Sequence, residues 1–152
     1  IEDGEVNARN LSRILKKFKG AYKFLPKPIF KQKTNASSNG LIYFGSTEAA
    51  MQESLDQLSA SGFPIDAMRI RSFPFGPEVW DFIDQHETIF LVEQNRDAQM
   101  KTLIVSEGNV NPEKFISILC FDGSPITANF ISESISDVLL NKNTSQPAEE
   151  IK

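Results

Sequence analysis

The hydrophobic positions of this chain fall into short runs that alternate with amphipathic stretches. The most apolar run is Ile89 to Val92, four large side chains in a row that follow Thr88 and precede a polar cluster. Such a run predicts a strand buried on both faces, because parallel strands covered by helices on each side show this pattern. It is too short for an ordinary helix, and Phe, Ile and Val favour strands. We expect the rest of the domain to cover this strand.

Three further apolar runs predict strands, at residues 41–44, 65–72 and 115–120. Between the strands, apolar residues recur at spacings of three and four, which predicts amphipathic helices. Their expected buried stripes are Met51, Leu55 and Leu58; Val79, Phe82 and Ile83; Met100, Leu103 and Ile104; and Ile131, Ile135, Val138 and Leu139. The alternation of these four strands with four helices predicts the α/β class, here a three-layer α/β/α domain with a mainly parallel sheet. We expect about five strands in the whole sheet.

Polar residues mark where these helices are expected to begin. Ser46 or Thr47, Asp97 and Thr127 precede three of them and are predicted to cap them. Pro77, which follows a glycine, suits the first helical position of the fourth.

The first part of the chain has a different character. Residues 7–19 predict an amphipathic helix with the stripe Leu11, Ile14, Leu15 and Phe18. Two prolines within residues 25–28 predict an extended connector, and residues 33–39 predict a polar linker. We therefore divide the chain into a basic helix and connector at 1–39, a compact domain at 40–140 and a disordered tail at 141–152.

The composition is that of a soluble globular domain, with 152 residues of which 24% are charged and 40% hydrophobic. No apolar run approaches the roughly 20 residues that span a bilayer, and there is no signal-peptide pattern. The single cysteine, Cys120, favours a cytoplasmic protein and is expected in the core. Because the sequence opens with Ile1, we expect a fragment of a longer protein.

Charge is distributed unevenly along the chain. Residues 9–33 contain nine basic and no acidic side chains, whereas residues 40–140 contain five basic and fifteen acidic ones. A basic arm can bind nucleic acid or phosphate, but this one lacks any known nucleic-acid module. We therefore favour an arm that packs on an acidic partner or on this acidic domain, and we expect no nucleic acid and no membrane among the partners.

Arg69 and Arg71 alternate with apolar residues in one expected strand, so their side chains share a face. Such a pair can hold a phosphate or carboxylate, but we favour ion pairs with Asp or Glu on a neighbouring helix or subunit. Phe73 and Phe75 follow in a proline-containing loop, which fits either an interface or closure of the end of the core.

The sequence contains no complete catalytic or metal-binding set. His86, the only histidine, lies at the end of an expected helix, where it more often satisfies carbonyls than acts as a base. One histidine and one cysteine cannot form a zinc or iron–sulfur site. Gly45-Ser46-Thr47 opens a helix after a strand, as phosphate-binding turns do, but lacks the following lysine. The residues alone predict a domain that binds a partner or supports a larger protein. They provide no catalytic set and no ligands for a cofactor or a metal ion.

Four segments, taken in order, resemble a known family. They are Tyr43-Phe44-Gly45-Ser46-Thr47 with Glu53, then Arg69 to Phe75, then Val92-Glu93-Gln94-Asn95 with Gln99, and finally Phe121 to Thr127. Together they are similar to the transketolase C-terminal-like domain of 2-oxoacid:ferredoxin (flavodoxin) oxidoreductase alpha subunits, of the 2-oxoglutarate or pyruvate branch. The basic helix and the Leu-Pro-Lys-Pro connector resemble what precedes this domain in the family. Family members often carry Gly before the Gln of the third segment, where this sequence has Ala98.

The resemblance implies a whole enzyme that oxidatively decarboxylates a 2-oxoacid to its acyl-CoA. Such an enzyme uses thiamine diphosphate, magnesium and iron–sulfur clusters, and it passes electrons to ferredoxin or flavodoxin. The resemblance also implies a beta subunit as partner, and cofactor-binding segments that lie outside this sequence. This chain would then bind no cofactor, would be inactive alone, and would help to assemble the oligomer.

We expect an interface where the strands end, because binding surfaces form at that edge of open α/β sheets. Its expected residues are Arg71, Phe73, Phe75, Glu93, Asn95 and Gln99. Two other hypotheses stay open at this point. One is a free-standing α/β anion-binding or regulatory module that uses the Gly45-Ser46-Thr47 helix start, and the other is a nucleic-acid-associated domain that uses the basic arm.

Overall fold

The computed structural model describes residues 3–31 and 37–144, and these residues contain one sheet of five strands in the order β1-β3-β2-β4-β5. The strands are β1 (Ile29–Lys31), β2 (Asn39–Phe44), β3 (Asp66–Ile70), β4 (Thr88–Glu93) and β5 (Phe115–Leu119). β2 pairs in parallel with β3 and β4, β4 pairs in parallel with β5, and β1 runs antiparallel to β3. The mainly parallel sheet that the sequence predicts is confirmed.

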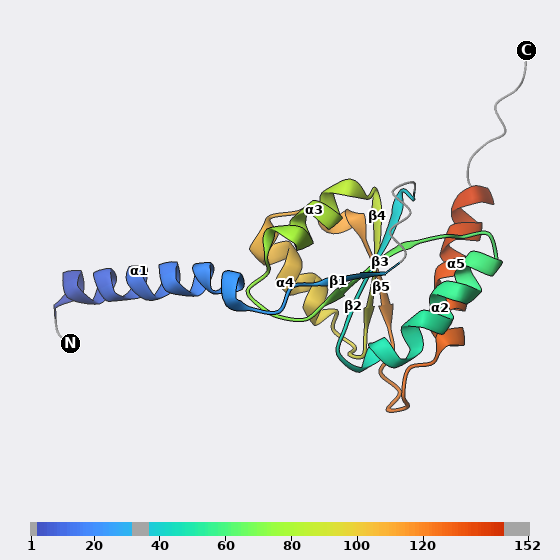
Figure 1. Cartoon of the computed structure of the whole chain (residues 1–152), viewed down its shortest axis with the longest axis horizontal. Helices are drawn as coiled ribbons and strands as arrows, with labels where there is room; N and C mark the ends of the chain where they lie inside the picture. The colour runs from blue at the N-terminus through green and yellow to red at the C-terminus, as the bar shows by residue number, and fades with distance from the viewer. Residues whose placement is uncertain (1–2, 32–36, 145–152) are drawn as a thin grey trace, which may run out of the picture.

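Helices cover both faces of the sheet (Figure 1). α2 (Glu48–Ala60) and α5 (Ala128–Thr144) pack on one face, and α3 (Pro77–Gln85) and α4 (Gln99–Gly108) pack on the other. Three short 3-10 helices, η1 (Ala21–Phe24), η2 (Gly45–Thr47) and η3 (Pro112–Lys114), join these elements within the described residues. The expected three-layer α/β/α arrangement is confirmed.

The apolar run of β4 is buried on both faces, as predicted, because its side chains point alternately to the two helix layers. Phe90 and Val92 belong to the core cluster that contains α2 and α5. Ile89 and Leu91 belong to the cluster that contains α3 and α4. One short strand therefore holds the two halves of the core together.

Two of the predicted helix starts are confirmed. Pro77 is the first residue of α3, and the Phe130 N–H donates to the Thr127 hydroxyl oxygen at 3.2 Å at the start of α5. The prediction that Ser46 or Thr47 caps α2 is wrong. The chain enters α2 through η2, so Thr47 already has helical dihedrals and its side chain makes no capping bond.

The basic arm is longer and more tightly joined to the domain than predicted. α1 (Gly4–Gly20) extends the expected helix at both ends, and β1, which was not predicted, lies against β3 with Phe30 opposite Met68. Two lysines of the arm pair with acidic residues of the domain, Lys27 with Glu78 at 2.8 Å and Lys31 with Glu48 at 2.6 Å. For these two lysines, the favoured interpretation that the arm packs on the acidic domain is confirmed.

α1 itself extends away from the sheet and its helix layers (Figure 1). The predicted apolar stripe is present but uncovered, with Leu11, Ile14, Leu15 and Phe18 between 46 and 58% exposed. Only the end of the stripe contacts the domain, where the Phe18 ring centroid lies 5.7 Å from that of Phe73. The apolar stripe of an amphipathic helix is normally buried against another surface, and the described residues provide no such surface for most of this one.

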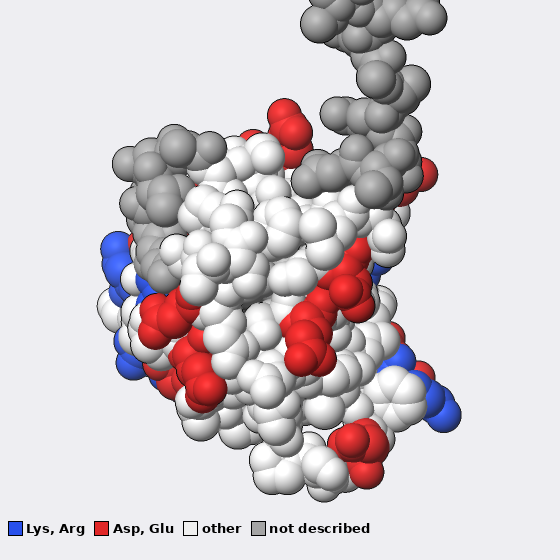
Figure 2. All heavy atoms as spheres, turned by 90° about the vertical axis from the view of Figure 1, so that its right-hand side faces the viewer, with Lys and Arg blue, Asp and Glu red and all other residues white. Residues whose placement is uncertain are grey.

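The opposite side of the molecule is acidic. Figure 2 shows the face of α2 and α5, on which acidic side chains gather and basic ones lie at the margins. The exposed acidic residues of these helices are Glu53, Asp56, Glu133 and Asp137, and neither helix has a basic residue before Lys142. The molecule is therefore polarised, with a basic arm on one side and an acidic helical face on the other.

The C-terminal tail begins later than predicted, because α5 continues through residues 141–144, which the sequence places in the tail. Residues 145–152 and 32–36 lie outside the described residues, and with them the first part, 33–36, of the expected linker. No helix in the described part of the chain is both long and apolar enough to cross a membrane.

His86 is buried at the amino-terminal edge of the sheet. Its Nδ1–H donates to the Phe82 carbonyl at 2.6 Å, and its Nε2 lies 3.3 Å from Oδ2 of Asp66, which is also buried. The prediction that His86 satisfies a helix carbonyl is confirmed. Gly40 of β2 packs directly against this histidine, because a Cβ placed on Gly40 would lie 3.0 Å from His86 Cγ and 2.8 Å from Ile89 Cδ1.

We predict that Gly40→Ala lowers the free energy of unfolding by about 1–3 kcal/mol, because the added methyl group overpacks the core. Urea denaturation measures the change. Gly20→Ala is the matched control, since a Cβ there meets no atom within 4 Å, and it should be neutral or slightly stabilising. Equal effects of the two variants would contradict the packing described at Gly40.

Candidate functional site

A cleft of about 360 Å³ opens at the carboxyl edge of the sheet, between the ends of β2 and β4. From β2 the chain crosses to β3 on one side, and from β4 it crosses to β5 on the other, so the two connections diverge. Such a switch point is where α/β sheets bind ligands or partners. Phe44, Gly45, Ser46 and Thr47 line one wall of the cleft. Gln94, Asn95, Gln99, Met100 and Leu103 line the other.

The wall that follows β4 is organised by the buried carboxylate of Glu93, which is 0% exposed. It accepts hydrogen bonds from the backbone N–H of Met100 at 2.8 Å and of Lys101 at 3.1 Å, and from Asn95 Nδ2 at 2.8 Å. Two of the N–H groups that the start of α4 leaves unpaired are thereby satisfied by a negative charge, which the helix dipole favours. The prediction that Asp97 caps this helix is wrong, because Glu93 and Asn95 do so; Asp97 is exposed and pairs with Arg96 at 2.7 Å.

The side-chain amides of the next two residues complete the wall. Asn95 Oδ1 accepts from the N–H of Asp97 at 3.1 Å and of Gln99 at 3.2 Å, which shapes the loop before α4. Gln94 Nε2 donates across the cleft to Ser46 Oγ at 3.0 Å and Thr47 Oγ1 at 3.1 Å. The two walls of the cleft are therefore tied together by one amide.

Ala98 has the left-handed dihedrals φ 49° and ψ 49°. The loop before α4 needs this conformation so that the N–H groups of the helix turn back toward Glu93. Left-handed dihedrals are unfavourable for any residue with a Cβ other than Asn and Asp, and glycine adopts them without penalty. The glycine that the resembling family often has at this point is thus the residue that this backbone favours.

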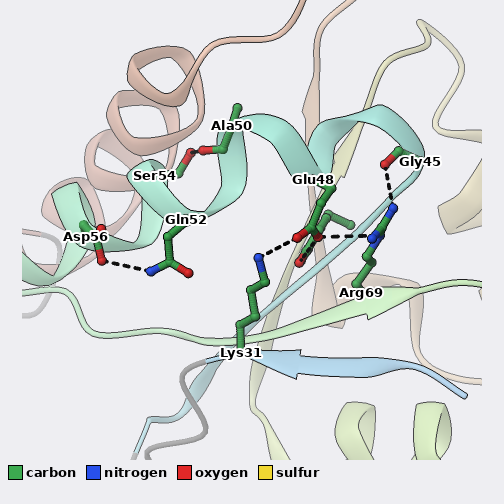
Figure 3. Close-up of polar contacts among 9 residues, drawn as sticks. Lys31, Gly45, Glu48, Ala50, Gln52, Ser54, Asp56 and Arg69 are labelled. Atoms are coloured by element: carbon green, nitrogen blue, oxygen red, sulfur yellow. Dashed lines mark hydrogen bonds and ion pairs between the residues drawn. The ribbon is translucent and has the colours of Figure 1, made fainter.

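The outer side of the β2 end is held by Glu48, shown with its partners in Figure 3. One carboxylate oxygen accepts from Lys31 Nζ at 2.6 Å, and the other accepts from the Tyr43 hydroxyl at 2.8 Å and lies 3.5 Å from Arg69 Nε. Arg69 also donates to the Gly45 carbonyl at 3.4 Å. The interpretation that Arg69 bridges to an acidic residue of a neighbouring helix is confirmed. Arg71 is exposed beyond the end of β3.

The charges of this cluster shift two pKa values. The hydrogen bond from Lys31 is the largest cause that lowers the pKa of Glu48 from its ordinary 4.5, and Tyr43 and Arg69 act in the same direction. Burial, followed by the hydrogen bond to Glu48, raises the pKa of Tyr43 well above its ordinary value. Glu48 is therefore ionised at neutral pH, and it binds the arm to the start of α2.

The six expected interface residues divide into two groups. Asn95 and Gln99 line the cleft, and Glu93 lies beneath it and is fully buried. Phe73 is 38% exposed and contacts Phe18, whereas Phe75 is 8% exposed and packs edge-on against Trp80. Neither phenylalanine nor Arg71 lines the cleft. Phe75 closes the end of the core, which is the second of the two alternatives that the sequence left open for this loop.

Several residues of the site have roles that the sequence did not indicate. Thr47, expected as a helix cap or as part of an anion-binding turn, is bridged across the cleft by Gln94. Met100 and Leu103, expected in a buried stripe, are only partly buried and line the cleft with Phe44. The parts of the chain that the structure describes hold no group of three or more His, Cys, Asp and Glu residues that could bind a metal ion. The arrangement therefore supports binding through hydrogen bonds and apolar contact.

No model of a known protein family matches the sequence, and no curated protein matches it. Solved structures do match. The 2-oxoglutarate:ferredoxin oxidoreductase from Magnetococcus marinus, with 2-oxoglutarate, coenzyme A and succinyl-CoA bound, has a TM-score of 0.79 at 19% identity over 90% of this chain. The alpha chain of a probable 2-oxoacid ferredoxin oxidoreductase from Thermoplasma acidophilum has a TM-score of 0.50 at 20% identity, covering 75% of this chain and 97% of that one.

A split-gene transketolase, described as an inactive beta4 tetramer, has a TM-score of 0.52 at 16% identity over 67% of this chain and 38% of that one. The fold is that of a transketolase C-terminal-like domain. At this level the resemblance stated from the sequence is confirmed, and the neighbours include oxoacid:ferredoxin oxidoreductases. This chain spans about a quarter (24%) of the length of the Magnetococcus chain.

We predict that Ala98→Gly raises the free energy of unfolding by about 1 kcal/mol, because it removes the left-handed strain of a Cβ. Denaturant unfolding measures the change. Asn109→Gly is the matched control, because Asn109 has similar dihedrals, φ 49° and ψ 40°, and Asn tolerates them. A loss of stability on Ala98→Gly would contradict the left-handed loop conformation described at this position.

We also predict a pH-dependent role for Glu48. Its pKa is lower in the folded than in the unfolded chain, so the stabilisation by its charge is present above the unfolded value and is lost as the pH falls through the folded value. Glu48→Gln should therefore be less stable than the wild type near neutral pH, and the difference should shrink below about pH 4.5. Thermal unfolding across this range measures it.

The control for this prediction is Glu53→Gln on the same helix, where the exposed carboxylate accepts from Gln57 at 3.3 Å. It should change the melting temperature little at any pH. A stability difference between wild type and Glu48→Gln that stays constant into acid would contradict the role of the Glu48 charge.

Proposed function

We propose that this chain is the C-terminal assembly domain of the alpha subunit of a thiamine-diphosphate-dependent 2-oxoacid:ferredoxin oxidoreductase. The proposed enzyme oxidatively decarboxylates 2-oxoglutarate, or a related 2-oxoacid such as pyruvate, to its acyl-CoA. The observation that carries the proposal is the match to the Magnetococcus enzyme over 90% of this chain. An identity of 19% supports a shared fold, and the function is inferred from that fold together with the motifs that resemble the family.

The extent of the match supports a role within a larger chain. Residues 37–144 make up less than three quarters of the sequence, so a match over 90% of it reaches into the basic arm. The shorter alpha chain from Thermoplasma matches only 75% of this sequence and is itself covered almost completely. The arm and the domain thus recur together in the longer chain.

The exposed stripe of α1 supports the same role. Four large apolar side chains face solvent on a helix that has Arg9, Arg13, Lys16 and Lys17 around them. In the proposed enzyme, the preceding domain of the alpha subunit covers this stripe. The flanking positive charges favour a covering surface that is apolar at its centre and acidic at its rim.

The cofactors of the proposed enzyme are assigned to its other parts. The described residues do not fit a magnesium or iron–sulfur site, because they contain no cluster of metal ligands, and no charged side chain lines the cleft to hold a diphosphate. Thiamine diphosphate, magnesium and the clusters would be bound by other domains and by the beta subunit. Ferredoxin or flavodoxin and CoA are proposed as partners of the whole cytoplasmic complex, and this chain alone is proposed to be inactive.

The carboxyl edge of the sheet is proposed as the surface that meets other subunits. Arg71, Phe73, Asn95 and Gln99 present side chains there. Glu93 and Phe75 support this surface without contacting a partner directly, because both side chains are buried. A paired substitution that tests this surface is therefore made at Arg71 and Phe73 and not at Phe75, because truncation of Phe75 would disturb the core.

One observation weighs against the alternative of a free-standing anion-binding module. An anion at this edge would need unpaired N–H groups at a helix start, and Glu93 already accepts those of Met100 and Lys101.

The proposal is tested by purifying this chain, tagged in its parent cell, under native conditions. We expect a companion chain with a stoichiometric amount of thiamine diphosphate and iron, measured by mass spectrometry and metal analysis. A chain that purifies alone, or with companions free of thiamine diphosphate, would overturn it.

We further predict that Leu15→Asp in α1 weakens this assembly by about tenfold or more, because a charge enters the centre of the buried stripe. The melting temperature of the isolated chain should not change, since Leu15 is 58% exposed there. Ser12→Asp, on an exposed position of the same helix beside the stripe, is the matched control for charge and should leave the assembly intact. Equal assembly of both variants would show that the stripe is not an interface.

A further inference from the structure

We propose that the cleft between β2 and β4 is a binding site for an uncharged, carbonyl-bearing group with a small apolar body. Its volume of about 360 Å³ lies at the lower end of the range of small-ligand sites, about 300–1,000 Å³. The site is argued from the groups that line the cleft, two of which, Asn95 and Gln99, also belong to the proposed subunit surface.

The first argument is an incompletely paired hydroxyl. Thr47 is 2% exposed, and its oxygen accepts from Gln94 Nε2 at 3.1 Å. A hydroxyl also has one hydrogen to donate, and among the described residues no other acceptor lies within hydrogen-bond distance of that of Thr47. A ligand oxygen in the cleft can accept this hydrogen.

Two further donors lie beside Thr47. The Ser46 hydroxyl accepts from the same Gln94 amide at 3.0 Å and, within the described residues, keeps its hydrogen to donate. The side chain of Gln99 is exposed at the mouth of the cleft, and its amide has no partner in the described parts of the chain. Donors on both walls favour a carbonyl oxygen, which can accept hydrogen bonds from two of them.

The apolar part of the lining determines what the carbonyl carries. Phe44, Met100 and Leu103 line the cleft and are only partly buried, so they present apolar surface to it. Apolar surface of this kind gains free energy when a small aliphatic group removes it from water. The ligand therefore combines a carbonyl with an aliphatic body.

The buried carboxylate of Glu93 disfavours an anionic form of this ligand. None of its lining residues is ionised. The buried carboxylate of Glu93 is hydrogen-bonded to Asn95 and to the N–H of Met100, both of which line the cleft, so a second negative charge would lie close to it. A neutral amide or ketone fits the same space without this repulsion.

Two sources supply this chemistry, a small molecule or a peptide carbonyl next to an aliphatic side chain in a partner protein. They are distinguished by titrating the isotope-labelled chain with three probes of similar shape and following its amide NMR signals. The probes are N-acetyl-leucinamide, its anionic counterpart N-acetyl-leucine, and methyl isobutyl ketone.

We expect saturable shifts confined to the residues of the cleft with N-acetyl-leucinamide, and binding of N-acetyl-leucine at least about fivefold weaker. Binding of the ketone as tight as that of the amide identifies a small molecule as the source. Binding of the amide alone identifies a peptide segment. Absence of saturable shifts at the cleft, or tighter binding of the anion, would overturn the proposal.

Variants test the assigned donor. Thr47→Val removes the hydroxyl and should lower the affinity for N-acetyl-leucinamide about fivefold, which is the effect of one hydrogen bond. Thr102→Val is the matched control, because Thr102 lies on α4 outside the cleft and donates to the Ala98 carbonyl at 3.1 Å. Gln99→Ala, at an exposed position, gives a second test that does not depend on a buried change. Unchanged affinity in both Thr47→Val and Gln99→Ala would contradict the site.

Discussion

The carboxyl edge of this domain depends on one buried charge, the carboxylate of Glu93. An ionised carboxylate out of water is destabilising unless hydrogen bonds replace its solvation. Here the N–H groups of Met100 and Lys101 and the amide of Asn95 replace it, at distances between 2.8 and 3.1 Å. These bonds fix the start of α4 relative to the end of β4. The loop between them, the left-handed Ala98 and the wall of the cleft all follow from that constraint.

Much of the fold could be predicted from the sequence because its signals are local. The apolar run of β4 and the stripe of α2 need only the side chains of their own segment to be recognised. β1 was missed because it is three residues long, and what makes it a strand is its pairing with β3, nearly forty residues further along the chain. The cap of α4 was assigned to Asp97 for a related reason. A capping rule considers only the residues next to the start of a helix. Glu93 precedes Met100 by seven residues, and it reaches the Met100 N–H because the end of β4 holds it there.

The candidate site was predicted in part. Asn95 and Gln99 were expected at the carboxyl edge, and they line the cleft there. Charge patterning also anticipated that the basic arm would meet acidic residues, as Lys27 and Lys31 do. The sequence did not indicate that Phe75 is buried while Phe73 is exposed, because both follow the same strand and only the packing against Trp80 separates them. It also indicated Thr47 only as a cap or as part of an anion-binding turn, because the hydrogen bond from Gln94 across the cleft depends on the tertiary fold.

The molecule consists of an α/β domain with a closed core and an arm whose apolar stripe is exposed. The two halves of the core are closed around β4, whereas α1 carries an apolar stripe without cover. A complete body with an uncovered helix is the form expected of a domain that works as part of a larger protein. The fold of the neighbours, and the quarter of the Magnetococcus chain that this sequence spans, agree with that form.

The central claim is that this domain belongs to a working 2-oxoacid:ferredoxin oxidoreductase. The most direct test is to deplete the chain with a specific antibody from an extract of the cells that make it, and then to measure CoA-dependent reduction of ferredoxin with 2-oxoglutarate and with pyruvate. The account predicts that depletion removes the activity with at least one of the two 2-oxoacids, and that the activity is recovered with the antibody-bound material. An extract that keeps its full activity with both after the chain has been removed would contradict it.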